Sequence, residues 1–188
     1  RLRGTAPGAQ ILLARAFGTT RTSMDGNTTD IIKAIEWAMQ RNARIINMSF
    51  AGSRDPAIER SLSWARQRGI ILVAAAGNAG PTSPPLFPAA NPAVIAVTAT
   101  DENDQIFRGA NRGNHIAIAA PGVALFLPTV GSDYRMTSGT SFAAAEVSGI
   151  VAMLRSWYAD ESAQQIVARI ATTADGTTGE PSLLTGAG

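Results

Sequence analysis

The sequence predicts an α/β fold with a largely parallel sheet, and two observations favour it. Short apolar runs alternate with helical patterns, which is the order expected when crossover helices connect parallel strands. One run, residues 70–75, is apolar at every position, as expected for a strand covered by helices on both faces. With 188 residues, 45% of them hydrophobic, the chain suits a single domain over residues 1–188 with one core.

Two helices are predicted in the first half of the chain from apolar periodicity and end signals. The first runs from Asp30, taken as its N-cap, to about Gln40 and has one apolar face. The second runs from Pro56 to about Gln67, because Asp55-Pro56 opens a helix well and Gly69 ends it.

Two further helices are predicted in the second half. Ser141 to about Tyr158 is rich in Ala, Val, Ile and Leu, which indicates a buried helix. Ser162 to about Thr172 is amphipathic. The residues predicted to face inward in this last helix are Ile166, Val167 and Ile170. Residues 172–188 form a Gly/Thr-rich tail that we expect to be loosely held.

The strands are predicted from short apolar runs bounded by turn residues. They are Gln10–Ala16, Arg44–Met48, Ile70–Ala75, Ala93–Val97 and Ile116–Ala119. Leu125–Leu127 and Tyr134–Met136 are predicted to pair as a hairpin around Gly131–Asp133. Gly77–Pro92 holds many Gly and Pro residues and is predicted to be a surface loop.

Composition argues against several classes of protein. The absence of cysteine excludes a disulfide scaffold and a thiolate metal site, and one histidine is too few for a typical zinc site. A net charge of +2 without a dense Lys/Arg run argues against a nucleic-acid partner. No apolar run is long enough to span a bilayer, and the sequence points to no cofactor.

The most informative segment is residues 137–145, where a glycine turn delivers Ser141 to the start of an Ala-rich helix. The free N–H groups and positive dipole end of a helix favour negative charge beside that hydroxyl. For an isolated serine the simpler interpretation is a helix N-cap. A second segment, residues 73–78, ends an apolar strand in Gly77-Asn78, where the amide of Asn78 can donate to a developing oxyanion or belong to a simple turn.

Together with Ile45–Gly52, these segments resemble the subtilisin-like protease (subtilase) family, in which Gly-Thr-Ser precedes a small-residue helix. Weaker matches are Ala6–Ala9 and Ala119–Gly122, and the resemblance runs from residue 4 to about residue 172 in family order. The sequence departs from the family pattern at Phe142, where Met is usual, and at Ala145-Glu146, where Pro-His is usual.

The resemblance implies a serine endopeptidase with a three-layer αβα, subtilisin-like fold that lacks its N-terminal strands. Ser141 is then the nucleophile, and Asn78 is the side-chain donor of the oxyanion hole. The residues implied to bind substrate are Ser49, Phe50, Ala51, Gly52, Ala75, Ala76, Gly77, Leu86 and Thr140. Leu86 stands at the base of the specificity pocket, where Gly is frequent, so small or medium apolar side chains are expected there.

The catalytic Asp and His of the family precede the serine in the chain, and no residue here matches them. His115 follows Asn78 and is expected to be a loop or surface residue, while Asp25 and Asp30 are expected in a turn and a helix cap. The sequence therefore predicts a fragment that is inactive alone. The alternative interpretation is a degenerate, non-catalytic module that binds peptides.

The resemblance also carries expectations about partners and location. Polypeptides are the expected substrates, a structural calcium ion is common among relatives, and a secreted or cell-envelope location is expected. In the family sheet, the strand that bears the catalytic Asp lies between the segments equivalent to Gln10–Ala16 and Arg44–Met48. Without it, these two segments are expected to pair directly or, as we favour, the chain is expected to self-associate.

Overall fold

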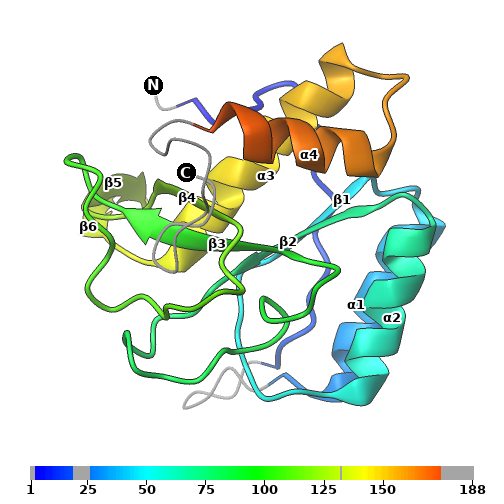
Figure 1. The fold of residues 1–188 in the computed structure, drawn as a ribbon, viewed down its shortest axis with the longest axis horizontal. Coiled ribbons are helices and arrows are strands. Elements are labelled where there is room, and N and C mark those ends of the chain that lie inside the picture. Colours follow the sequence, from blue (N-terminus) through cyan, green and yellow to red (C-terminus); the bar gives the residue numbers. More distant parts are fainter. Residues whose placement is uncertain (1–2, 19–25, 132, 175–188) are drawn as a thin grey trace.

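The computed structural model describes residues 3–18, 26–131 and 133–174 of the chain, so Asp25 and most of the C-terminal tail lie outside the described residues (Figure 1). The helices are α1 (Thr28–Gln40), α2 (Pro56–Gln67), α3 (Thr140–Trp157) and α4 (Ala163–Thr173). The strands are β1 (Ile45–Met48), β2 (Ile71–Ala75), β3 (Ile95–Thr100), β4 (Ile118–Pro121), β5 (Leu125–Pro128) and β6 (Tyr134–Thr137).

Four parallel strands form the central sheet in the order β1-β2-β3-β4. Helices α1 and α2 lie on one face of this sheet, and α3 and α4 lie on the other (Figure 1). Strands β5 and β6 pair as the predicted antiparallel hairpin. The predicted three-layer α/β fold with a parallel sheet is therefore confirmed, although β3 and β4 each begin and end two or three residues later than predicted.

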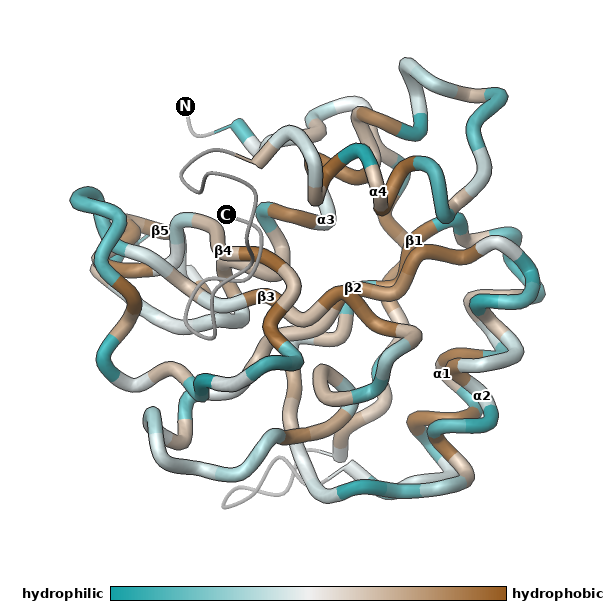
Figure 2. Tube along the Cα trace, in the orientation of Figure 1, coloured by the Kyte–Doolittle hydropathy of each residue, from teal (hydrophilic) through white to brown (hydrophobic). Residues whose placement is uncertain are grey.

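Strand β2 divides the core into its two layers. Ile71, Val73 and Ala75 pack with α3 and α4, whereas Leu72 and Ala74 pack with α1 and α2. All five residues are buried, as the continuous apolar run predicts. The hydrophobic colour of the chain accordingly concentrates in the middle of the sheet (Figure 2).

Side-chain caps set the starts of α1 and α2. The Asp55 side chain accepts hydrogen bonds from the backbone N–H groups of Ala57 and Ile58 and caps α2, which starts at Pro56 as predicted. The prediction for Asp30 is wrong: Asn27 is the cap of α1 and accepts from the N–H of Asp30, so the helix starts one turn earlier. Thr28 donates to the Asp55 carboxylate, and this bond and the N–H of Ala57 lower the pKa of Asp55.

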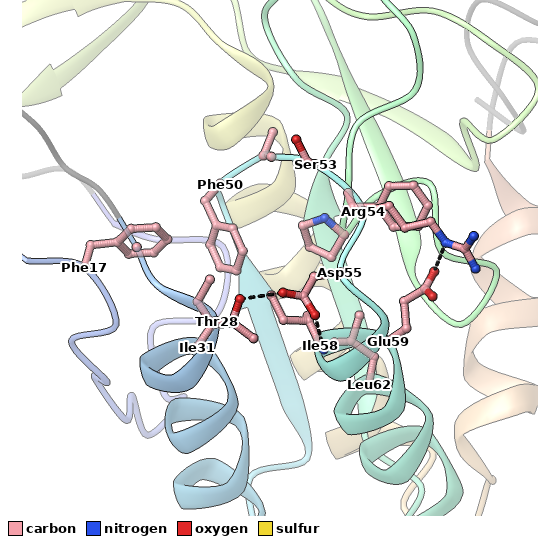
Figure 3. Close-up of a pocket in the computed structure, with 15 residues that line it drawn as sticks. Phe17, Thr28, Ile31, Phe50, Ser53, Arg54, Asp55, Ile58, Glu59 and Leu62 are labelled. Carbon is pink, nitrogen blue, oxygen red and sulfur yellow. Dashed lines mark hydrogen bonds and ion pairs between the residues drawn. The ribbon is translucent and has the colours of Figure 1, made fainter.

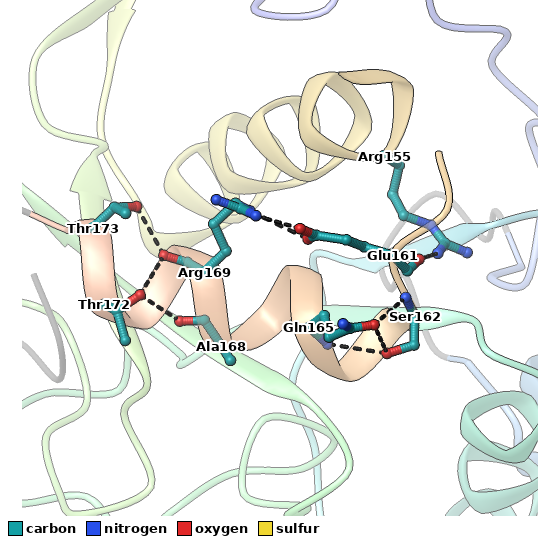
Figure 4. Close-up of polar contacts among 8 residues, drawn as sticks. All are labelled: Arg155, Glu161, Ser162, Gln165, Ala168, Arg169, Thr172 and Thr173. Carbon is teal, nitrogen blue, oxygen red and sulfur yellow. Dashed lines mark hydrogen bonds and ion pairs between the residues drawn. The ribbon is translucent and has the colours of Figure 1, made fainter. Parts of the chain in front are cut away.

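Helix α4 is fastened at its first turn and along one side (Figure 4). Ser162 and Gln165 form a reciprocal capping box, and Arg169 forms an ion pair with Glu161. Ile166 and Ile170 are buried as predicted. Val167 is 37% exposed, so its predicted inward orientation is wrong, because only a narrow stripe of this single helix touches α3.

The predicted strand Gln10–Ala16 is absent, which corrects the sequence-based prediction. No residue of this segment is paired in a described strand, and the side chains of Ile11 and Leu13 are 77% and 87% exposed. The nearest pairing is a single antiparallel bridge between Phe17 and Gly26. A strand needs a ladder partner, and the described part of the chain offers this segment none.

Candidate functional site

The predicted site residues meet where the carboxyl ends of β1 and β2 face the first turn of α3. Parallel α/β sheets present ligands at this edge, because the loops that follow the strands converge there. Ser49 follows β1, Asn78 follows β2 and Ser141 is the second residue of α3. The fold therefore brings together the three segments that the sequence singled out, although they lie up to 92 residues apart.

Ser141 does not cap its helix. Gly139 is the N-cap of α3 and makes no side-chain cap bond, so the simpler interpretation of Ser141 as a cap is wrong. The half-buried Ser141 instead donates its hydroxyl hydrogen to the carbonyl oxygen of Ser49 at 3.3 Å. Its backbone N–H has no hydrogen-bond partner among the described residues, as expected for the first turn of a helix.

Asn78 is oriented by the same helix terminus. Its Oδ1 accepts hydrogen bonds from the backbone N–H of Thr140 at 3.0 Å and from the Thr140 hydroxyl at 2.9 Å. Its Nδ2 lies beside Gly139, 3.2 Å from the place that a Cβ would occupy there. Because the oxygen is held by Thr140, Nδ2 is left beside Gly139, in the turn that leads into Ser141. The predicted role as an oxyanion donor requires a place near that serine.

Thr140 connects the turn that follows β2 with the first turn of α3. It is fully buried, and its hydroxyl accepts from the N–H of Gly77 at 3.2 Å while it donates to Asn78. Its side chain therefore holds the amide donor in place and is not exposed to a substrate. Gly77 adopts a positive φ of 111°, a conformation that favours glycine.

Ser49 and Ser141 hold each other through reciprocal bonds. The Ser49 hydroxyl donates to the carbonyl oxygen of Ser141 at 3.0 Å, and it accepts from Nδ2 of Asn47 at 2.9 Å. The oxygen of Asn47 accepts in turn from the hydroxyl of Ser148 at 3.1 Å. This chain of polar contacts fixes the end of β1 against α3.

Ser49–Gly52 and Ala75–Gly77 are the predicted walls of a substrate pocket, and Leu86 is its predicted base. Ser49, Ala51 and Gly52 are exposed and Phe50 is half-buried, which leaves this stretch accessible along one side. Ala75, Ala76 and Gly77 are buried. The Cδ1 atom of Leu86 lies 2.9 Å from the place that a Cβ on Gly77 would occupy, so Leu86 fills the space against that wall.

A pocket of about 400 Å³ lies beside the Phe50–Gly52 stretch (Figure 3). Phe17 and Phe50 meet edge to face within it, with ring centroids 5.0 Å apart. Ile31, Ile58 and Leu62 give its floor an apolar character, and Arg54 pairs with Glu59 at 3.0 Å on its rim. This pocket can hold an apolar side chain next to the Phe50–Gly52 stretch.

His115 lies at the amino end of β4, whereas the site gathers at the carboxyl ends of the strands. The sequence-based expectation that His115 is not a base for Ser141 agrees with this position. His115 lies in the turn before β4, in agreement with the predicted loop, but both ring nitrogens are buried and have no hydrogen-bond partner among the described residues. Burial lowers the pKa of His115, since desolvation disfavours the charged imidazolium.

This burial predicts a dependence of stability on pH. Because the pKa of His115 is lower in the folded state, its contribution is fully present above the unfolded pKa of about 6.5 and is lost as the pH falls through the folded value. We expect the thermal midpoint to fall more between pH 7 and pH 5 in the wild type than in His115→Gln. Equal slopes for the two proteins, measured by calorimetry, would contradict this assignment.

Neither a metal cluster nor a membrane span is evident in the described part of the chain. No group of three His, Cys, Asp or Glu side chains gathers there in a way that could hold an ion. No described helix is both long enough and apolar enough to cross a bilayer.

Sequence reasoning missed two asparagines that organise the site. Asn47 lies on β1 with its polar side chain on the α3 face, and Asn111 is fully buried against the Gly77-Asn78 turn. A polar residue inside an apolar strand was the available signal for Asn47. Asn111 gave no such signal, because its partners lie about 30 residues away in the chain.

The chain matches known proteins over nearly its whole length. A family model described as "Subtilase family" matches residues 1–188. The chain is 35% identical over 175 residues to thermitase of Thermoactinomyces vulgaris, covering 93% of this chain and 61% of thermitase. It is 34% identical to subtilisin DY of Bacillus licheniformis, covering 91% of this chain and 63% of that protein.

Solved structures give the same result for the fold. The self-cleaved protease domain of PatA is 33% identical, with a TM-score of 0.82 over 92% of this chain and 68% of that domain. Sphericase is 26% identical, with a TM-score of 0.78 over 88% of this chain and 64% of that protein. The chain thus spans less than two thirds of the length of thermitase and of subtilisin DY.

Proposed function

This chain belongs to the subtilase family, and from that premise we propose that the protein it comes from is a serine endopeptidase with Ser141 as its nucleophile. One observation carries the proposal. The amide of Asn78 is held through its oxygen by Thr140, and its nitrogen lies beside Gly139 in the turn that leads into Ser141. A nucleophile and a preorganised oxyanion donor at one helix terminus suit acyl transfer.

In the proposed reaction a histidine base takes the hydroxyl hydrogen of Ser141 while Oγ attacks the carbonyl carbon of the peptide bond. The oxyanion of the tetrahedral intermediate accepts hydrogen bonds from Nδ2 of Asn78 and from the backbone N–H of Ser141. The protonated base then gives its proton to the leaving amine, and water later hydrolyses the ester formed on Ser141.

We assign the base, and the aspartate that orients it, to residues outside this 188-residue sequence. Two observations support this. The one histidine, His115, lies at the other end of the sheet, and the hydroxyl of Ser141 donates to a backbone carbonyl, which cannot accept a full proton. We therefore expect the 188-residue chain alone to be inactive, because a serine hydroxyl without a base is a weak nucleophile.

We assign polypeptide substrates to the exposed edge at Ser49–Gly52. Both backbone groups of Gly52 already pair with Phe87. An extended peptide can therefore pair with the main chain before Gly52, which gives affinity with little dependence on sequence. Its side chain before the cleaved bond would lie between this edge and the wall of Ala75, Ala76 and Gly77. No cofactor is assigned to the reaction, and the family resemblance favours a location outside the cytoplasm or in the cell envelope.

Leu86 is expected to restrict the specificity pocket. In the full-length protein, Leu86→Gly should raise kcat/KM for substrates with Phe at the cleaved position, relative to Ala, by about 10- to 100-fold. The reason is that burying a large apolar side chain contributes roughly 1.5–3 kcal/mol, and Leu86 occupies that space. Val130→Gly, a change at a fully exposed aliphatic side chain away from the site, is the control and should leave the ratio unchanged.

The same substrates test the preference of the wild type. None of the residues assigned to the walls or base of the pocket is acidic, so a buried Lys or Arg side chain would have no counter-charge. A cleavage profile dominated by basic residues, or an unchanged ratio in Leu86→Gly, would contradict the assignment.

The alternative function is a non-catalytic module that binds peptides at the same edge. The pairing of Ser141 with an oriented Asn78 favours the enzyme, because binding alone requires neither group. Incubating the full-length protein with a fluorogenic peptide library separates the two. Cleavage supports the endopeptidase, whereas saturable binding without cleavage supports the module.

A further inference from the structure

We propose that Asn111 is a positioning residue that holds the oxyanion donor Asn78, an inference that rests on the proposed function. Asn111 follows Ala110 in the segment before β4, and its side chain has no exposed surface. Burying an amide costs free energy unless each polar atom is hydrogen-bonded, so the partners of this side chain reveal its role.

The partners of Asn111 lie on both sides of Asn78. The backbone N–H of Asn111 donates to the carbonyl oxygen of Gly77 at 3.0 Å. Its Oδ1 accepts from the N–H of Ala79 at 2.9 Å. The residues immediately before and after the donor are thus tied to a single buried side chain and its own backbone.

The amide nitrogen of Asn111 binds the same loop at a later residue. Nδ2 of Asn111 donates to the carbonyl oxygen of Pro84 at 3.1 Å. A backbone bond from Gly80 to Gly109, at 2.9 Å, lies next to this cluster. Both polar atoms of the Asn111 side chain therefore form hydrogen bonds with the segment that carries Asn78.

The donor needs such support because its own attachment is limited. Asn78 is exposed, follows a glycine with positive φ and, among the residues that the structure describes, is held through its side chain by Thr140 alone. Space is also tight, since a Cβ on Gly77 would lie 2.9 Å from Oδ1 of Asn111. An oxyanion donor acts only when it is fixed close to the developing charge, and a displacement of about 1 Å can cost about 10²-fold in rate.

The test measures whether Asn111 acts through Asn78. In the full-length protein, Asn111→Ala is expected to lower kcat about 10- to 100-fold with little change in KM. In an Asn78→Ala background the same substitution is expected to lower kcat less than about 3-fold, because the donor it positions is already gone. Equal losses in both backgrounds would overturn the inference and leave a purely structural role.

A conservative variant guards against simple unfolding. Asn111→Asp keeps an acceptor for the N–H of Ala79, and its protonated form can still donate to Pro84. We expect the kcat of Asn111→Asp to be much closer to that of the wild type than the kcat of Asn111→Ala is, even if both substitutions lower the thermal midpoint. If kcat falls in proportion to the thermal midpoint across the wild type, Asn111→Asp and Asn111→Ala, the inference is contradicted.

Hydrogen exchange gives a readout that does not depend on activity. The amide hydrogen of Ala79 should exchange at least about tenfold faster in Asn111→Ala than in the wild type, because its acceptor is removed. Unchanged exchange would overturn the inference even in an active enzyme. Undiminished kcat in Asn78→Ala would instead defeat the proposed oxyanion role of Asn78, a result that the exchange measurement does not affect.

Discussion

Replacing Ser141 with alanine is expected to lower peptide turnover by the full-length protein about 10⁶-fold, the size of loss known for removal of the nucleophile in the relative subtilisin. The physical reason is that the neighbouring hydroxyl at this helix terminus, that of Thr140, is buried and bonded to Asn78 and Gly77, so it cannot replace the Ser141 hydroxyl. The oxyanion donor and bound substrate remain in the variant, so a small residual rate is expected.

A fluorophosphonate probe measures the same step directly, since it labels a serine only when a base activates it. The full-length protein should be labelled at Ser141. Ser138→Ala is the matched control: this serine lies three residues away, and its oxygen accepts from the N–H of Ala124, so labelling should persist. Label on another residue, or undiminished label in Ser141→Ala, would contradict the proposed function, and the 188-residue chain alone should not react.

The parts of the fold that the sequence predicted well are those specified by neighbouring residues. Helix α2 begins at Pro56 and ends at Gln67 as predicted, because Asp55 caps it and the chain turns at Gly69. The fully apolar run of β2 was likewise identified as a buried strand, because few other structures accommodate such a run. In each case the signal and the structure that it specifies lie within about a dozen residues.

The errors concern residues whose structure depends on distant partners. Gln10–Ala16 has the composition of a buried strand, but composition does not supply the neighbouring strand that would bury it. The role of Asn111 depends on contacts with Ala79 and Pro84, which no local pattern encodes. Ser141 and Asn78 were identified through a family resemblance, and only the geometry shows that Thr140 connects them.

The site therefore depends on two kinds of information. The chemical groups can be named from short segments, because nucleophiles and donors need particular residue types. Their orientation cannot be predicted from such segments. Asn78 is oriented by Thr140, 62 residues away, and its turn is held by a bond between Ala79 and Asn111, 32 residues apart.

The 188-residue chain, produced alone, is expected to self-associate at micromolar concentration. Strand β1 pairs with β2 on one side, and none of the described residues forms a ladder on its other side. Direct pairing of Gln10–Ala16 with β1 was one expected solution, but the structure has no such ladder, so that expectation is wrong. The open edge and the exposed side chains of Ile11 and Leu13 are therefore left for a second copy.

Association is favoured because a second copy can both pair with the open edge of β1 and cover the exposed side chains of Ile11 and Leu13. A strand from another copy can pair with β1, and each backbone group that becomes buried without a partner would otherwise cost roughly 1–3 kcal/mol. Burying Ile11 and Leu13, which are 77% and 87% exposed, adds a hydrophobic gain of about 1.5–3 kcal/mol for each side chain.

Sedimentation velocity on the purified chain measures this directly, and charged substitutions locate the contact. Ile11→Asp combined with Leu13→Asp should shift the chain toward monomer, because a carboxylate buried in the new contact would be desolvated. Val130→Asp, at a fully exposed side chain that follows β5, is the matched control and should leave the association unchanged. A wild-type chain that sediments as a monomer and unfolds cooperatively would show that solvent alone satisfies the open edge of β1, and would defeat the prediction.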